Sequence, residues 1–421
     1  MGVKESHKTI RGRFFLPTDT FSFDYLDDAI LEIGSDGKII YSGPAQEKHH
    51  NIAITNPKAI WFPGFVDTHI HYPQTRIIGS ATGALLTWLE KSVFPEECKF
   101  EDHHYAQDVA TEFTKNLAQF GTTTAAVFGS SLPSATDILF EKLAHTGLRA
   151  IVGLTLMNRL APDPLLMETA AAMDACHMLT EKWHGYDNHR LGFALTPRFA
   201  LSCSPGLLKA SSDFAAKNKL LIQTHLSENH IEIESTQKAF PKSSDYVGVY
   251  DDFGLVNERT LFAHCLWLGE QEWTTLKERK CSIAHCPDSN FFLNSGNMPW
   301  AKTRELGIKT GLGTDVGAGR SFSMRRMVSS AFDNALQQKS FPLPTELLWH
   351  ATRGGALALN LGDSVGLLDA GYQADIVALE TPPYLESPKQ ILETIAFNQE
   401  AVTVRETRVS GKLIYGNNPQ F

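Results

Sequence analysis

The amino-acid sequence predicts an α/β fold: a TIM-like (β/α)8 barrel with a small β-sandwich domain formed by the N- and C-terminal segments. Two observations lead to this fold class. Eight short runs rich in apolar and β-branched residues recur through the middle of the chain, and stretches with helical patterning separate them. Strand-like runs also gather at both ends of the chain, which suggests that the two ends pack together.

Eight runs of the middle segment are expected to be the barrel strands. They cover residues 64–70, 122–128, 150–156, 191–196, 220–225, 260–264, 282–285 and 310–313. The helical stretches are residues 108–120, 135–145, 166–183, 206–217, 232–240, 270–278 and 324–338. Strands that alternate with helices are typical of parallel sheets, and eight such units indicate a barrel.

The strand-like runs at the ends define the second part of the fold. They are residues 10–15, 25–33 and 38–42 near the N-terminus, and 374–379, 402–409 and 413–415 near the C-terminus. We therefore expect residues 1–62 and 366–421 to form the β-sandwich domain together. Residues 63–365 form the barrel in this division, and the barrel carries the catalytic metal site.

Composition and charge exclude several classes of protein. The 421 residues are 43% hydrophobic and 20% charged, which suits a large core and does not indicate disorder. The net charge of -9 argues against a nucleic-acid partner. No run approaches the roughly 20 apolar residues that span a bilayer. The polar start lacks a signal-peptide core, and the six cysteines form no C-x-x-C pair, so we expect a cytoplasmic protein without a membrane partner.

Residues 1–6 fit the loose pattern for myristoylation at Gly2. No polybasic second anchor follows them, so a chance match is the better interpretation.

A His-x-His pair ends the first predicted barrel strand. Residues two apart on a strand face the same way, so His69 and His71 should point together. Imidazole nitrogen is a good ligand for Zn²⁺ or Fe²⁺. The alternative is that the two are ordinary polar histidines near a turn.

Further titratable residues follow other predicted strands. They are His225, His264, His285 and Asp315. The carboxyl ends of barrel strands form the face on which barrel enzymes build their active sites. Because several such residues fall at different strand ends, we expect a shared site.

Histidines and a carboxylate together make a mixed nitrogen and oxygen ligand set for a metal. Such a metal lowers the pKa of bound water to roughly 7, which leads to hydrolysis at neutral pH. Glu228 follows His225 by three residues and could carry protons between water and substrate. The alternative for Glu228 is a first-turn residue favoured by a helix dipole. H-E-x-x-H, P-loop, G-x-S-x-G and P-C-x-x-C motifs are all absent.

Nine segments of the chain carry a family resemblance. They are residues 63–74, 86–89 with 94–97, 121–125, 196–200, 225–229, 262–265, 285–290, 313–319 and 351–356. Over nearly its whole length the chain resembles the amidohydrolase superfamily, through its His-x-His, His and Asp segments. The Tyr-Pro-Gln, Trp-Leu, Thr-Pro-Arg-Phe and Ser-Glu-Asn segments are similar to those of the guanine deaminase family within it.

The resemblance implies a role for each candidate residue. His69, His71, His225 and Asp315 would bind one zinc, although similar sites accept iron. His264 would hydrogen-bond the metal's water, Glu228 would shuttle protons, and Asp315 would take the water's proton. The implied reaction converts guanine to xanthine and ammonia in purine catabolism, in a homodimer.

Four residues are candidates for holding the purine. Gln74 and Arg198 could serve its polar edge, and Phe199 or Trp88 could stack on its face. The alternatives are packing at the barrel mouth for the aromatic residues and a structural salt bridge for Arg198. His285 has no assigned role.

Two departures from the family pattern, Asp288 and Arg353, replace no proposed ligand. One alternative function is a related aminohydrolase acting on a pterin, triazine, cytosine or adenosine derivative. The other is a non-catalytic scaffold, which predicts damaged metal ligands, and none is damaged here.

Overall fold

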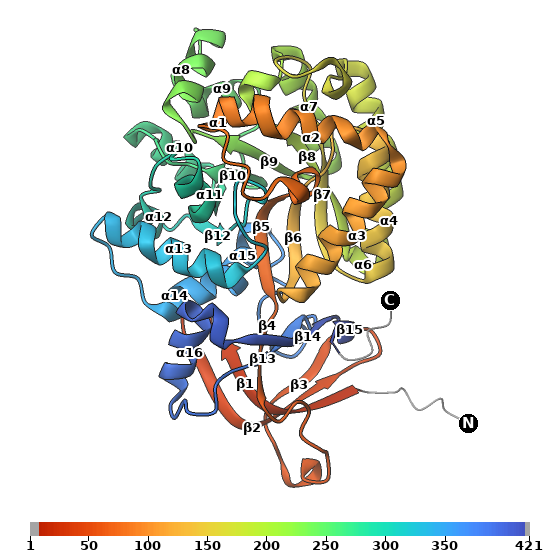
Figure 1. The fold of residues 1–421 in the computed structure, drawn as a ribbon, viewed down its shortest axis with the longest axis vertical. Helices are drawn as coiled ribbons and strands as arrows, with labels where there is room; N and C mark the ends of the chain where they lie inside the picture. Colours follow the sequence, from red (N-terminus) through yellow and green to blue (C-terminus); the bar gives the residue numbers. More distant parts are fainter. Residues whose placement is uncertain (1–7, 417–421) are drawn as a thin grey trace.

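The computed structural model describes residues 8–416, and it shows a barrel stacked on a second, smaller sheet (Figure 1). Gly2, with its myristoylation-like pattern, lies outside the described residues. The eight barrel strands are β5 (Phe65–His71), β6 (Thr122–Phe128), β7 (Arg149–Leu156), β8 (Leu191–Pro197), β9 (Leu221–Leu226), β10 (Thr260–His264), β11 (Ser282–His285) and β12 (Lys309–Leu312). All neighbouring strands in this sheet pair in parallel. The predicted barrel is confirmed, and each strand end lies within one residue of its expected place.

The first and last barrel strands, β5 and β12, are joined by a few specific bonds. The Thr68 hydroxyl donates to the Leu312 carbonyl at 2.9 Å. Just beyond β12, the Asp315 amide donates to the His69 carbonyl at 2.8 Å, and the His71 amide donates to the Val316 carbonyl at 3.1 Å. The seam of the barrel therefore closes at the strand ends that carry the candidate ligands.

Helices surround the barrel, and many begin at a capping residue. The longer ones are α3 (His103–Gln119), α4 (Pro133–Thr146), α5 (Thr169–Trp183), α7 (Pro205–Asn218), α8 (His230–Ala239), α10 (Glu270–Glu278) and α13 (Met324–Gln337). The shorter ones are α6 (Tyr186–His189), α9 (Tyr246–Asp252), α11 (Pro287–Phe292), α12 (Trp300–Leu306), α14 (Pro344–Trp349) and α15 (Gly355–Ala358). The Asp102 side chain caps α3, which therefore begins five residues before the predicted start at 108. No helix within residues 8–416 is long and apolar enough to cross a membrane.

Two short helices between β5 and α3 cross the carboxyl-end face of the barrel (Figure 1). They are α1 (Leu85–Trp88) and α2 (Phe94–Glu97), and a single π-helical turn joins them. The sequence analysis placed no helix here, because four-residue helices carry too little periodicity to be recognised.

The chain ends meet in one mixed sheet, as expected. Its strands are β1 (Lys8–Pro17), β2 (Phe23–Ile33), β3 (Ile39–Pro44), β4 (Ala59–Pro63), β13 (Ile376–Glu380), β14 (Thr403–Val409) and β15 (Lys412–Tyr415), and α16 (Pro388–Phe397) lies between β13 and β14. The sheet order is β15-β14-β13-β4-β1-β2-β3. The Ile39 amide donates to the Tyr372 carbonyl at 2.8 Å, so the β3 edge bends back toward β13. The predicted β-sandwich is thus a single sheet that curls over its own core, which includes Leu31, Trp61 and Ile376.

Gly64 marks the place where the chain leaves this sheet and enters the barrel. Its amide donates to the Asp375 carbonyl at 2.9 Å, between β4 and β5. A Cβ at this position would lie 2.1 Å from the Thr123 hydroxyl, so only glycine fits. We propose the boundary between the two domains at this residue.

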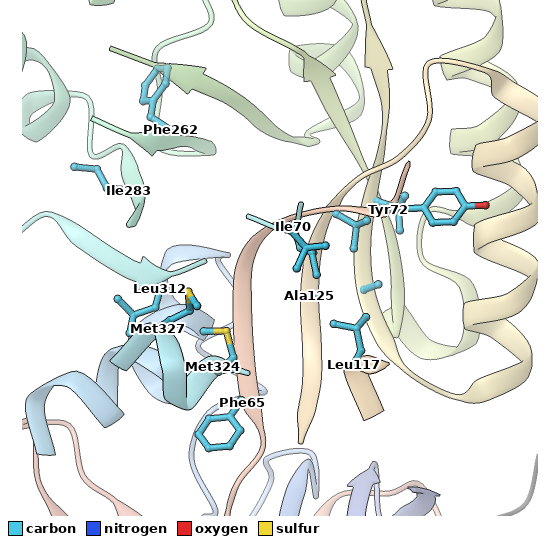
Figure 2. Close-up of a cluster of buried hydrophobic side chains, with 14 of the residues drawn as sticks. Phe65, Ile70, Tyr72, Leu117, Ala125, Phe262, Ile283, Leu312, Met324 and Met327 are labelled. Carbon is cyan, nitrogen blue, oxygen red and sulfur yellow. The ribbon is translucent and has the colours of Figure 1, made fainter. Parts of the chain in front are cut away.

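The main core fills the space between the barrel strands and the helices around them. Figure 2 shows part of it, with Phe65, Ile70, Leu312, Met324 and Met327 in one continuous apolar layer. All five side chains are buried. Burial of this apolar surface is the main source of stability for the scaffold that holds the site.

A buried ion pair joins the barrel to the curled sheet. Arg149 on β7 donates to both oxygens of Asp375, from Nε at 2.8 Å and from Nη2 at 3.3 Å. An Asp375→Ala variant should be less stable by about 3–5 kcal/mol, because it leaves the Arg149 charge buried and unpaired. Urea unfolding measures the effect. Asp213→Ala, which breaks an exposed pair with Lys209, is the control and should cost less than about 1 kcal/mol. Equal losses in the two variants would contradict the prediction.

Candidate active site

Four of the predicted residues meet at the carboxyl ends of three strands. His69 and His71 lie on β5, His225 on β9, and Asp315 just after β12. One donor atom from each lies within 4.8 Å of all the others. The Asp315 Oδ1 atom is 3.2 Å from Nε2 of both His69 and His71. The structure therefore brings together the whole ligand set that the sequence analysis named.

The donor set has the chemistry that a divalent metal requires. His69 Nε2 is buried and has no hydrogen-bond partner among the described residues. His225 Nδ1 lies 2.6 Å from the Arg198 carbonyl and donates to it, which leaves the Nε2 lone pair free for a metal. His71 Nε2 also lies 3.2 Å from His225 Nε2. Imidazole nitrogens that face each other beside a carboxylate form a donor set that suits a bound cation.

The electrostatics of the cluster favour the same protonation states. Burial lowers the pKa of His71 to about 3. Desolvation, helped by the neighbouring histidines, lowers the pKa of His225 well below its usual value. Burial alone would raise the pKa of Asp315, but the adjacent His69 and His71 side chains hold it well below the usual range. Neutral imidazoles and an ionised carboxylate are the forms that bind metals.

Two proton-transfer candidates lie beside the ligands. His264 Nε2 is 3.4 Å from Glu228 Oε2 and 3.9 Å from Asp315 Oδ2. Burial, together with the negative charge of Asp315, raises the pKa of Glu228 to about 8. A carboxyl group with a pKa in this range can both give and take a proton near neutral pH.

Three side chains on or just after helix α11 hydrogen-bond the predicted site residues, and none of the three was predicted from the sequence. The Ser289 hydroxyl donates to Asp315 Oδ2 at 2.6 Å. The Asn290 Oδ1 atom lies 2.9 Å from His264 Nδ1, so it accepts the proton of that nitrogen. Just past the helix, the Ser295 hydroxyl donates to Glu228 Oε1 at 3.0 Å. Each side chain holds one predicted site residue in a single orientation.

His285 does not join the site, although it also ends a barrel strand. Both of its ring nitrogens are buried without a partner among residues 8–416, and its ring packs near Trp300 with centroids 5.7 Å apart. Along β11, Ala284 faces the barrel interior, and His285 therefore faces the outer helices. His264 follows Ala263 in the same way, but its φ of 72° breaks the alternation and turns its side chain into the site.

A cavity lies over the ligand cluster, and His71, His225 and Asp315 are among the residues that line it. All four predicted substrate residues line it: Gln74, Trp88, Arg198 and Phe199. Trp88 and Phe199 also belong to the apolar cluster at the barrel mouth, so they both pack and face the cavity. Apolar walls with a few polar groups can hold a small heterocycle and fix its orientation.

Arg198 makes the salt bridge that the sequence analysis kept as its alternative. Its Nη1 atom donates to Glu97 Oε1 at 3.0 Å and to Oε2 at 2.8 Å. Glu97 was not predicted as a site residue. The pair leaves Arg198 on the cavity wall, so the salt bridge and a ligand-binding role are compatible.

The two departures from the family pattern lie away from the ligands. Asp288 is fully buried and forms ion pairs with Arg320 at 2.6 Å and Arg326 at 3.0 Å. Arg353 donates to the Gly362 carbonyl. Both therefore have structural partners and leave the cavity unchanged.

Fold and site together define a metal-dependent hydrolase of the barrel type. The amidohydrolase family matches residues 60–414 of the chain. Guanine deaminase of Escherichia coli (strain K12) is 38% identical over 396 residues, which cover 90% of this chain and 89% of that protein. The chain belongs to the amidohydrolase family.

Solved structures extend the similarity to three dimensions. The structure of E. coli guanine deaminase has a TM-score of 0.93 and 35% identity, and it covers 98% of this chain and 100% of its own. Guanine deaminase from C. acetobutylicum, solved with guanine in its active site, has a TM-score of 0.91 and 30% identity, with 97% and 100% covered. The similarity therefore includes both the barrel and the second sheet.

Proposed function

We propose that this protein is a zinc-dependent guanine deaminase, which converts guanine and water to xanthine and ammonia in purine catabolism. The observation that carries the proposal is the position of the His69, His71, His225 and Asp315 cluster directly below a cavity lined by Gln74 and Arg198. The similarity to guanine deaminases over nine-tenths of the chain supports the same substrate.

Asp315, Glu228 and His264 each have a separate role in the proposed reaction. A divalent metal in the site would acidify water and so supply a nucleophile at neutral pH. Asp315 takes a proton from the water, and the oxygen bonds to the ring carbon that bears the exocyclic amine. Glu228 gives a proton to the adjacent ring nitrogen, and Asp315 passes its proton to the exocyclic amine. Ammonia then leaves as the carbon–nitrogen bond breaks, and the new hydroxyl returns a proton to Glu228 as it becomes the carbonyl of xanthine. His264 hydrogen-bonds the developing oxyanion.

The cavity walls hold the purine. Gln74 and Arg198 would bind its polar edge, and Phe199 and Trp88 would contact its flat faces. Zinc is favoured over iron because three histidines and one carboxylate are common zinc ligands, although iron accepts the same set. We also propose that the protein is a cytoplasmic homodimer, as the family resemblance implies, and sedimentation of the purified protein tests the dimer.

The test is ammonia release over a panel of guanine, cytosine, a pterin, a triazine and adenosine, with guanine conversion also followed by ultraviolet absorbance. We expect guanine to be the preferred substrate by at least roughly 100-fold. Treatment with a chelator should abolish the activity, and one equivalent of zinc should restore it. Preference for another heterocycle would identify a related aminohydrolase. Activity that survives complete metal removal would contradict the proposed role of the four ligands.

A further inference from the structure

Glu97 lies behind the wall of the cavity and contacts both polar residues proposed to hold the purine. It ends helix α2, is 3% exposed, and does not line the cavity itself. Its Oε1 atom accepts from Gln74 Nε2 at 3.2 Å, and both of its oxygens accept from Arg198 Nη1. One buried carboxylate thus fixes two side chains that are far apart in the sequence.

The contacts determine which way the Gln74 amide points. Its nitrogen donates to Glu97, and its oxygen accepts from the Gly317 amide at 3.2 Å. A flipped amide would place an oxygen against the Glu97 carboxylate and an NH₂ group against an N–H. The negative charge of Glu97 therefore keeps the NH₂ group of Gln74 beside the Arg198 guanidinium.

The contacts also determine what Arg198 offers to a ligand. Only Nη1 of the guanidinium has partners among the described residues: Glu97 and the sulfur of Met157. The guanidinium lies against the Phe94 ring, with Cζ 5.5 Å from its centroid. The N–H groups of Nε and Nη2 remain for a ligand, and a guanidinium has no acceptor. This edge of the cavity consequently presents hydrogen-bond donors.

We propose that Glu97 is a positioning residue that keeps this edge a donor edge and thereby selects a purine with a carbonyl, rather than an amino group, at C6. The inference rests on the proposed deamination of guanine. Guanine offers two acceptors away from the amine that leaves: the C6 carbonyl oxygen and the N7 ring nitrogen. An amino group at C6 would instead set donor against donor, and a site built for hydrogen bonds rejects such a mismatch strongly.

The test compares guanine with 2,6-diaminopurine, which has the same amine at C2 but an amino group at C6. The zinc-loaded full chain and its Glu97→Gln and Glu97→Asp variants are assayed for kcat and KM on both purines. Where turnover of 2,6-diaminopurine is undetectable, its competitive Ki against guanine is measured. In Glu97→Gln we expect kcat/KM for guanine to fall roughly 10- to 100-fold, mainly through KM. The preference for guanine over 2,6-diaminopurine should fall by a similar factor, and Glu97→Asp should recover part of it.

Glu96→Gln is the matched control. Glu96 is the neighbouring buried glutamate of α2, and its carboxylate bonds Lys99 and Tyr105 instead of cavity residues. This variant should keep the preference of the unchanged protein, whatever its thermal stability. Equal losses on both purines in Glu97→Gln, or an equal change of preference in Glu96→Gln, would overturn the proposal.

The proposed deamination of guanine and the proposed role of Glu97 can be contradicted independently of each other. If the unchanged protein does not deaminate guanine, the proposed function fails. The binding of 6-oxo and 6-amino purines to the zinc-loaded protein and to its Glu97 variants, measured by calorimetry, would then decide whether Glu97 sets the preference. If Glu97→Gln does not fold, the Glu97→Asp variant carries the same comparison, and an unchanged preference in it together with an unchanged KM would overturn the role.

Discussion

A Glu228→Gln variant is expected to lose roughly 10²- to 10⁴-fold in kcat while it still binds one equivalent of metal. Glutamine has nearly the same shape and can keep the hydrogen bond from Ser295, but it cannot exchange a proton. The carboxyl is within 3.4 Å of His264 and is not one of the four ligand-type donors. Steady-state kinetics at saturating guanine and metal analysis of the purified variant measure the two properties.

Glu234→Gln provides the control, because Glu234 is an exposed glutamate on α8, the helix that follows Glu228. It should keep full activity. Near-normal turnover by Glu228→Gln would exclude the carboxyl from proton transfer, whereas loss of the metal would show a different role, in binding it.

The Glu228→Gln variant should also be more stable than the parent protein when both are free of metal, although it is less active. The pKa of Glu228 is about 8 in the folded chain, because the side chain is buried, and about 4.5 as its ordinary value. Below pH 4.5 the folded and the unfolded parent protein both hold this proton, so it does not change the free energy of unfolding. As the pH rises from 4.5 to 8, the unfolded chain releases the proton while the folded chain still holds it, so the parent protein progressively loses stability that the glutamine variant retains. Thermal unfolding of metal-free parent and variant should therefore diverge between pH 4.5 and 8, with the variant more stable.

An Asp315→Asn variant should lose on the order of 10⁴-fold or more in guanine turnover and bind metal at least about 100-fold more weakly. Two contributions disappear together, since Asp315 is both a ligand-type donor and the proposed acceptor of the water's proton. The asparagine can still accept from Ser289, so the local packing is preserved. Metal titration and the guanine assay measure the two losses.

Asp333→Asn, which changes an exposed aspartate of α13, is the matched variant and should behave as the unchanged protein. Full metal content in Asp315→Asn would contradict the assignment of Asp315 as a ligand. A loss of activity that added zinc restores completely would contradict its role in proton transfer.

The barrel strands could be predicted from the sequence because most of them are short apolar runs separated by stretches with helical patterning. The strand β4 could not, because Ala59–Pro63 and the following β5 form one apolar stretch with a single glycine between them. Only the structure shows that this glycine separates two sheets. The short helices α1 and α2 were missed for a related reason, since their order comes from packing over the barrel mouth instead of from local periodicity.

The ligand cluster was predictable because topology places the carboxyl ends of parallel strands together. The same rule could not separate His264 from His285, since both end a strand. The difference is a left-handed backbone at His264, which no sequence pattern indicated. Glu97 lies in a segment that carries the family resemblance, but no pattern assigned it a role, because its partner Arg198 is 101 positions away and its own helix is only four residues long.

The seam of the barrel has a consequence for how the protein holds its shape. Backbone hydrogen bonds of His69, His71 and Asp315 connect β5 to the segment after β12. The side chains of the same three residues belong to the proposed metal-ligand cluster. An ion bound by these side chains would link the first and last strands of the barrel to each other, and through His225 also to β9. Metal binding would then raise the thermal stability of the protein as well as allow its activity, since a ligand that binds only the folded chain stabilises that chain.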